Sequence, residues 1–113
     1  MAANSEIILS SNTHPGDSTV TTVTGTNFKG DGYYGRSDGL HSVQYTYVGL
    51  KGTITIQGTL ATSPVDSDWF DVHTYTASQE TASKVANFTG NYVWIRSKVV
   101  YTDGTVSKIQ LNH

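Results

Sequence analysis

The sequence contains no cysteine, and only 14% of its 113 residues are charged. The lack of cysteine excludes disulfide frameworks, thiol nucleophiles and zinc sites built from thiolates. The charged fraction is well below the roughly 25% of an average soluble domain. The seven basic residues stand singly along the chain and form no polycationic stripe, so a nucleic-acid partner is not expected.

Long apolar runs are also missing. No segment approaches the roughly 18–20 apolar residues that a membrane-spanning helix needs. The first six residues, Met1 to Glu6, lack the basic and apolar regions of a secretory signal. The sequence therefore predicts neither a membrane partner nor export through a signal peptide.

β-Branched residues are abundant, because valine, isoleucine and threonine together make up 34 of the 113 residues. These side chains lose rotamer freedom in helices but pack well on a pleated sheet. Eleven glycines are spread along the chain and punctuate short segments. This pattern predicts an all-β fold: a single small antiparallel β-sandwich over residues 1–113, jelly-roll-like, with short strands and a Gly-rich loop. Residues 1–24 would form an N-terminal arm or edge strands.

Alternation of apolar and polar residues places the strands. The expected strands cover residues 6–10, 19–24, 42–48, 53–60, 69–72, 92–101 and 105–111. Residues 25–39 hold five glycines and form the longest expected loop, and residues 74–86 are expected to be mostly loop. The inward face is expected to include Val43, Tyr45 and Tyr47 on one strand, and Ile54, Ile56 and Leu60 on another.

A hairpin is expected at the C-terminus, across Thr102, Asp103 and Gly104. A three-residue loop there pairs Ile95 with Leu111, which brings apolar residues together. The same register places Lys98 opposite Lys108, an unfavourable like-charge pair.

Residues with catalytic or metal-binding chemistry are sparse. The four histidines are far apart, and no serine stands in a nucleophile-elbow motif. Asp66, Asp68 and Asp71 cluster at a turn, where stabilisation of the turn is favoured over a calcium site, because the spacing lacks the glycine and the distal glutamate of a calcium loop. The sequence therefore predicts no catalytic residues, no metal and no cofactor, and a protein that is not an enzyme.

Aromatic residues are the main candidates for contact with a partner. Tyr33 and Tyr34 lie in the Gly-rich loop and Trp69 at the start of a strand, where they would stack on sugar rings, anchor a protein interface or simply pack. A second group, Tyr92, Trp94 and Arg96, alternates along one strand and is expected to share one docking face.

The second half of the chain resembles a known family. The stretches GTITIQGTLATSPVDSDWFDV, from Gly52, and NFTGNYVWIRSKVVYTDGT, from Asn87, resemble small β-sandwich virion proteins of tailed bacteriophages, notably those that infect cyanobacteria. The resemblance covers about residues 50–113. It implies a structural role in the virion, as a capsid decoration or tail accessory protein.

The partners implied by this resemblance are further copies of the chain, for example in a trimer, and the major capsid or tail proteins. The alternative is a carbohydrate-binding module that presents Trp69, Tyr33 and Tyr34 to a host surface glycan. The sequence leaves both roles open.

Overall fold

The computed structural model describes residues 5–17, 19–30, 32–33 and 39–112. Three strands of 19 or 20 residues dominate it: β5 (Leu40–Thr59), β6 (Phe70–Thr89) and β7 (Trp94–Asn112). The remaining elements are β1 (Ser5–Leu9), β2 (Asn12–Thr13), β3 (Thr21–Thr24), β4 (Phe28–Lys29) and a single 3₁₀ turn, η1 (Asp66–Asp68). The predicted all-β antiparallel fold is confirmed, although three of its strands are far longer than expected. None of these described elements is a helix long and apolar enough to cross a membrane.

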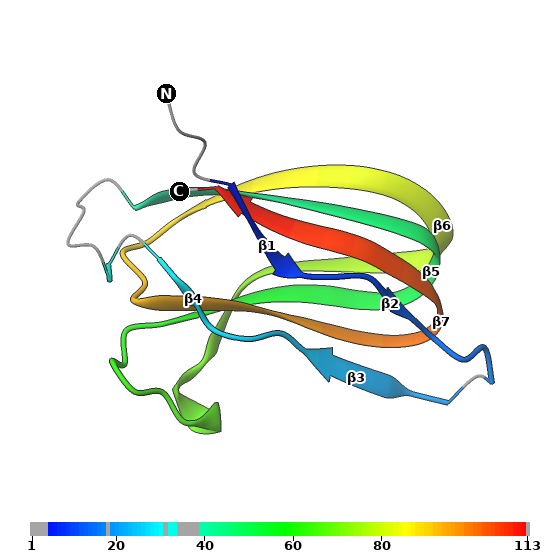
Figure 1. Ribbon diagram of the computed structural model, residues 1–113, viewed down its shortest axis with the longest axis horizontal. Coiled ribbons are helices and arrows are strands. Elements are labelled where there is room, and N and C mark those ends of the chain that lie inside the picture. Colours follow the sequence, from blue (N-terminus) through cyan, green and yellow to red (C-terminus); the bar gives the residue numbers. More distant parts are fainter. Residues whose placement is uncertain (1–4, 18, 31, 34–38, 113) are drawn as a thin grey trace.

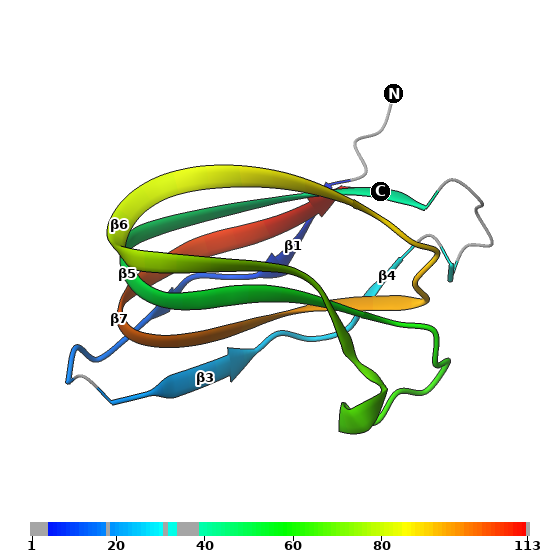
Figure 2. The same ribbon diagram turned by 180° about the vertical axis from the view of Figure 1, so that it is seen from behind.

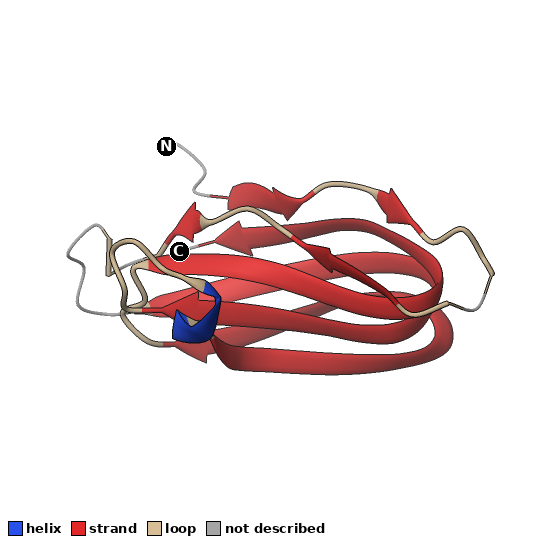
Figure 3. Ribbon diagram, turned by 90° about the horizontal axis from the view of Figure 1, so that it is seen from below, coloured by secondary structure: helices blue, strands red, loops and turns tan. Residues whose placement is uncertain are grey.

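Each long strand bends halfway and crosses from one layer of the molecule to the other (Figure 1). The bends lie at Gly49, Gln79 and Gly104, where φ is +59°, +61° and +98°. Glycine at two of these three positions is expected, because a positive φ costs glycine little. β5 pairs with β6 and with β7 on both sides of its bend. One antiparallel sheet, with the order β1-β7-β5-β6, therefore folds over on itself into a sandwich (Figure 3).

Each layer contains half of every long strand. The first layer is made of residues 40–48, 80–89 and 105–112, and the second of residues 51–59, 70–78 and 94–102. Because β1 and β2 pair with the C-terminal half of β7, they extend the first layer. β3 and β4 pair with its N-terminal half and extend the second layer (Figure 2).

The predicted C-terminal hairpin is wrong. Tyr101 pairs with Gly52 and Val106 pairs with Tyr47, so both halves of β7 lie beside β5, in different layers. The bend gives each half a full ladder on β5, whereas a hairpin would pair the two halves with each other. Lys98 and Lys108 are consequently in separate layers, and the unfavourable pair does not form.

The predicted loop over residues 74–86 is also wrong, because this segment is part of β6 and pairs with β5 along its length. Its alternation is present but weak. Tyr75 and Ala77 pair with the inward-facing residues of β5, whereas Thr74 and Thr76, which alternate with them, are exposed. Most inward-facing residues of this segment are small or polar. The period of two that marks a strand is therefore not visible in the spacing of its aliphatic side chains.

The hydrophobic core lies between the two layers. The predicted inward face of residues 42–48 is confirmed, but Leu60 is 70% exposed because β5 ends at Thr59. The fully buried aliphatic residues come from both layers and are Ile8, Val43, Leu50, Ile54, Ile56, Ile95, Val99, Val106, Ile109 and Leu111.

Three tyrosine rings pack together inside the sandwich. The centroids of Tyr45 and Tyr47 are 6.3 Å apart, and each ring also contacts Tyr75. The Tyr45 hydroxyl lies 3.0 Å from Nε2 of His73. Burial raises the pKa of both Tyr45 and Tyr47 above the usual value of a phenol, and the neighbouring Tyr75 raises both further. Burial alone raises the pKa of Tyr101.

These raised values predict how stability depends on alkaline pH. A phenol whose pKa is higher in the folded than in the unfolded chain ionises first in the unfolded chain. The stabilisation from Tyr45, Tyr47 and Tyr101 is therefore complete below about pH 10, the pKa of an unperturbed phenol, and is lost as the pH rises above it. Urea unfolding is expected to show a constant free energy from neutral pH to about pH 9 and a steep fall above pH 10. A free energy unchanged above pH 10 would contradict this.

Candidate functional site

A row of aromatic and cationic side chains lies on the outer face of the second layer. Trp94 and Arg96 face outward from β7 because Ile95, between them, is fully buried in the core. The Tyr33 ring lies 5.2 Å from the Trp94 ring, and the Arg96 guanidinium lies 4.3 Å from the centre of the Trp69 ring. We call Tyr33, Trp94, Arg96 and Trp69 the aromatic strip.

The Tyr33 end of the strip depends on glycine. The backbone of Gly30 donates to the carbonyl of Val93, and that of Gly32 donates to the carbonyl of Tyr92. A Cβ at either glycine would overlap the backbone of residues 91–92, so the Gly-rich sequence here allows the two segments to touch. Tyr33 itself is 46% exposed, and Nζ of Lys29 lies 4.6 Å from its ring centre.

The Trp69 end is held by polar contacts to the loop between β5 and β6. The Trp94 indole Nε1 donates to the Thr62 carbonyl, at 2.9 Å. The Arg96 Nε donates to Oε1 of Gln57 at 2.8 Å, and the Gln57 amide in turn donates to Asp71 at 3.0 Å. Although Arg96 lies on the outer face, its side chain is only 14% exposed. The bond from Trp94 to Thr62 and the contact of Arg96 with Trp69 hold residues 60–69 against the sheet.

Of the three clustered aspartates, Asp68 stabilises the turn, as the sequence indicates, whereas Asp66 and Asp71 make other contacts. The Asp68 carboxylate accepts a hydrogen bond from the Val65 N–H, at 2.9 Å, across η1. Asp66 lies 3.8 Å from Arg96, and Asp71 accepts from Gln57. Among the residues described, no three potential metal-ligating side chains come together.

Tyr92 does not share the face of Trp94, so that prediction is wrong. β7 begins at Trp94, and the N–H of Val93 donates to the Thr59 carbonyl, which ends the alternation before Tyr92. The Tyr92 ring packs over Gly58, near Phe88. It lines a pocket of about 430 Å³ at the loop end of the sandwich, which we call the end pocket, with Thr59, Leu60, Ala61, Ser67, Asp68 and Phe70. Tyr34 lies outside the described residues.

Threonines continue the outer face of the second layer beyond the strip. One row across the sheet places Lys98 between Thr24 and Thr55, with Thr74 beyond. The next row places Val100 between Thr22 and Thr53, with Thr76 beyond. These rows could not be predicted from the sequence, because they require β3, β5, β6 and β7 to share one layer.

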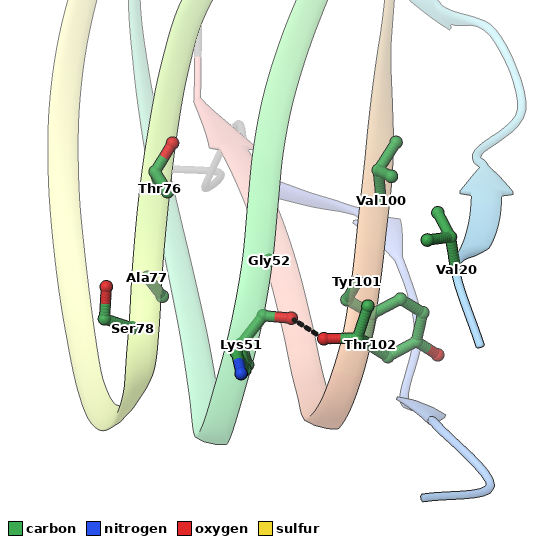
Figure 4. Close-up of a pocket in the computed structure, with 9 residues that line it drawn as sticks. All are labelled: Val20, Lys51, Gly52, Thr76, Ala77, Ser78, Val100, Tyr101 and Thr102. Atoms are coloured by element: carbon green, nitrogen blue, oxygen red, sulfur yellow. Dashed lines mark hydrogen bonds between the residues drawn. The ribbon is translucent and has the colours of Figure 1, made fainter. Parts of the chain in front are cut away.

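A shallow groove of about 340 Å³ lies at the end of this face that is nearest the bends (Figure 4). It crosses neighbouring segments of β6, β5 and β7, and Val20, 72% exposed, forms part of its lining. The Thr102 hydroxyl donates to the Lys51 carbonyl within the groove, at 3.3 Å. The residues that line it are Val20, Lys51, Gly52, Thr76, Ala77, Ser78, Val100, Tyr101 and Thr102.

No protein-family model matches this chain, and no curated protein matches its sequence. Solved structures match its fold. The crystal structure of PirA aligns with a TM-score of 0.53 at 13% identity, over 99% of this chain and 94% of PirA. CBM29_1, a family 29 carbohydrate-binding module from Piromyces equi, aligns with a TM-score of 0.50 at 11% identity, over 100% and 93%.

The K3 adhesin domain of Lys-gingipain from Porphyromonas gingivalis w83 aligns with a TM-score of 0.52 at 1% identity, over 81% of this chain and 63% of that chain. The chain shares the β-sandwich fold of these proteins. At such low identity the likeness concerns the fold alone.

Proposed function

We propose that this protein is a non-enzymatic carbohydrate-binding module that binds its ligand on the aromatic strip. The observation that carries the proposal is the position of the two tryptophans. Both Trp69 and Trp94 lie outside the core, on one face, and are held there by Arg96 and by the Thr62 carbonyl. Rings that are already fixed lose little conformational entropy when a ligand binds.

The chemistry around the rings is that of a sugar-binding surface. The apolar faces of pyranose rings stack on aromatic side chains, and sugar hydroxyls need donors and acceptors nearby. Asp71, which is exposed and accepts a hydrogen bond from the buried Gln57, presents a carboxylate beside Arg96, and Tyr33 extends the aromatic surface past Trp94. The shared fold with CBM29_1 supports the proposal, since that protein is a carbohydrate-binding module.

Calorimetric titration with a panel of oligosaccharides tests this proposal. We expect Tyr33→Ala to weaken binding by about tenfold, which corresponds to the loss of one stacking contact. Phe70→Ala is the matched control, because Phe70 is an exposed aromatic residue of the end pocket rather than of the strip. Loss of binding in Phe70→Ala with normal binding in Tyr33→Ala would move the site to the end pocket and overturn the proposal.

The virion role implied by the family resemblance stays a prediction, together with its oligomer and its capsid or tail partners. The comparisons with solved structures do not bear on it, because they show the fold alone.

A further inference from the structure

We infer that the ligand is an acidic glycan, one that carries carboxylate or sulfate groups, and that it lies along the outer face of the second layer from the aromatic strip to the groove. This inference rests on the proposed function and specifies its ligand. The first observation is the distribution of charge. Lys29, Arg96, Lys98 and Lys51 lie on this one face and are four of the seven basic residues of a chain whose net charge is −2.

The lysines on this face form no ion pair with a described carboxylate. In the part of the chain that the structure describes, the ion pair is between Arg96 and Asp66, and none of these lysines has a carboxylate within 4 Å. Asp71 accepts from Gln57, and Asp103, which pairs with Lys51 along the backbone, accepts from Gln79 and from the Gly104 N–H. Hydrogen bonds from amides leave these carboxylates charged, but the carboxylates lie at the ends of the face, Asp66 and Asp71 near Arg96 and Asp103 opposite Lys51. The positive charge with no described carboxylate beside it is that of Lys98, at the centre, and of Lys29, beside Tyr33.

The shape of the face fits an extended polymer. Trp94, Arg96, Lys98, Val100 and Thr102 follow each other at alternate positions of β7, about 6.6 Å apart, so the face runs for about 26 Å. Its far end is the groove with Lys51 (Figure 4). Aromatic rings at one end and ammonium groups along the centre and at the other end match a chain of several acidic sugars.

The hydroxyl groups beside the lysines favour a glycan over other polyanions. Lys98 is flanked by Thr24 and Thr55, and the hydroxyls of Thr53 and Thr76 lie 3.3 Å apart in the next row. These groups both donate and accept hydrogen bonds, as sugar hydroxyls require. A polyphosphate backbone would instead be matched by dense basic clusters, and the lysines here stand singly.

Calorimetric titration of the full chain tests the inference with four probes of similar length: an oligouronate, a sulfated oligosaccharide, a neutral oligosaccharide and single-stranded DNA. We expect at least one acidic glycan to bind about tenfold more tightly than the neutral one, with an affinity that falls as salt rises. The tighter of the two acidic probes identifies the anionic group. Lys98→Gln is expected to reduce acidic-glycan affinity about fivefold and to leave neutral-glycan affinity unchanged.

Lys108→Gln, in the first layer, is the matched control and should change neither affinity. Unchanged thermal unfolding of both variants shows that they fold. Equal affinity for neutral and acidic glycans, no effect of Lys98→Gln, or tighter binding of DNA would overturn the inference. In the first two cases the proposed function survives, whereas binding of none of the glycans would overturn the proposed function itself.

Discussion

Replacing Gly104 with alanine is expected to destabilise the fold by about 3 kcal/mol or more. Gly104 has a φ of +98°, in a region that alanine rarely adopts. An added Cβ would also overlap the backbone of Gly49 and Leu50, where the bends of β7 and β5 pack against each other. Neither the bend of β5 nor the bend of β7 can move away without breaking the hydrogen bonds between these two strands. Urea unfolding followed by tryptophan fluorescence measures the loss.

Gly16→Ala separates the cost of the positive φ from the cost of the overlap between the added Cβ and the neighbouring backbone. Gly16 also has a positive φ, +79°, but no atom lies within 4 Å of an added Cβ there. Its substitution should cost only the backbone strain, about 1–2 kcal/mol. Equal losses in the two variants would show that the bends are not packed as described.

Arg96→Leu is expected to cost about 2–3 kcal/mol and to abolish measurable glycan binding. The variant loses the hydrogen bond from Nε to Gln57 and the contact with the Trp69 ring. Gln57 is only 8% exposed, so its Oε1 would be left without that donor in a buried place. Trp69 would lose the contact that holds its ring against residue 96 of β7, and the strip would lose its shape.

Lys98→Leu is the matched control for stability. Lys98 lies two residues further along the same outward side of β7, and the structure shows no hydrogen bond or ion pair for it among the described residues. Its replacement should change the free energy of unfolding by less than about 0.5 kcal/mol. If Arg96→Leu were as mild as this control, Arg96 would not hold the loop between β5 and β6.

The fold class and the inward faces of several strands could be predicted from local pattern. Val43, Tyr45 and Tyr47 alternate with polar residues, and their burial followed from that alternation. The bends could not be predicted in this way. A glycine after an aspartate, as at Gly104, is typical of a hairpin, and only the pairing of both halves of β7 with β5 makes it a bend between layers.

The candidate site was predictable in part for the same reason. The outward position of Trp94 and Arg96 follows from the burial of Ile95 between them, within one strand. The approach of Trp69 to Arg96 could not be predicted, because it depends on a loop that folds back and bonds to Trp94 through Thr62. The threonine rows likewise require four strands to be placed in one layer.

The most direct test of the account is an NMR titration of the two tryptophan indole N–H signals with an acidic oligosaccharide. The chain has two tryptophans, and both lie in the aromatic strip, so these two signals report on the proposed site alone. The side-chain amide signals of Gln44, on the exposed face of the first layer, provide the internal control. The account predicts that both indole signals shift with saturation while the Gln44 signals stay in place. Saturable binding that leaves both indole signals unmoved would contradict it.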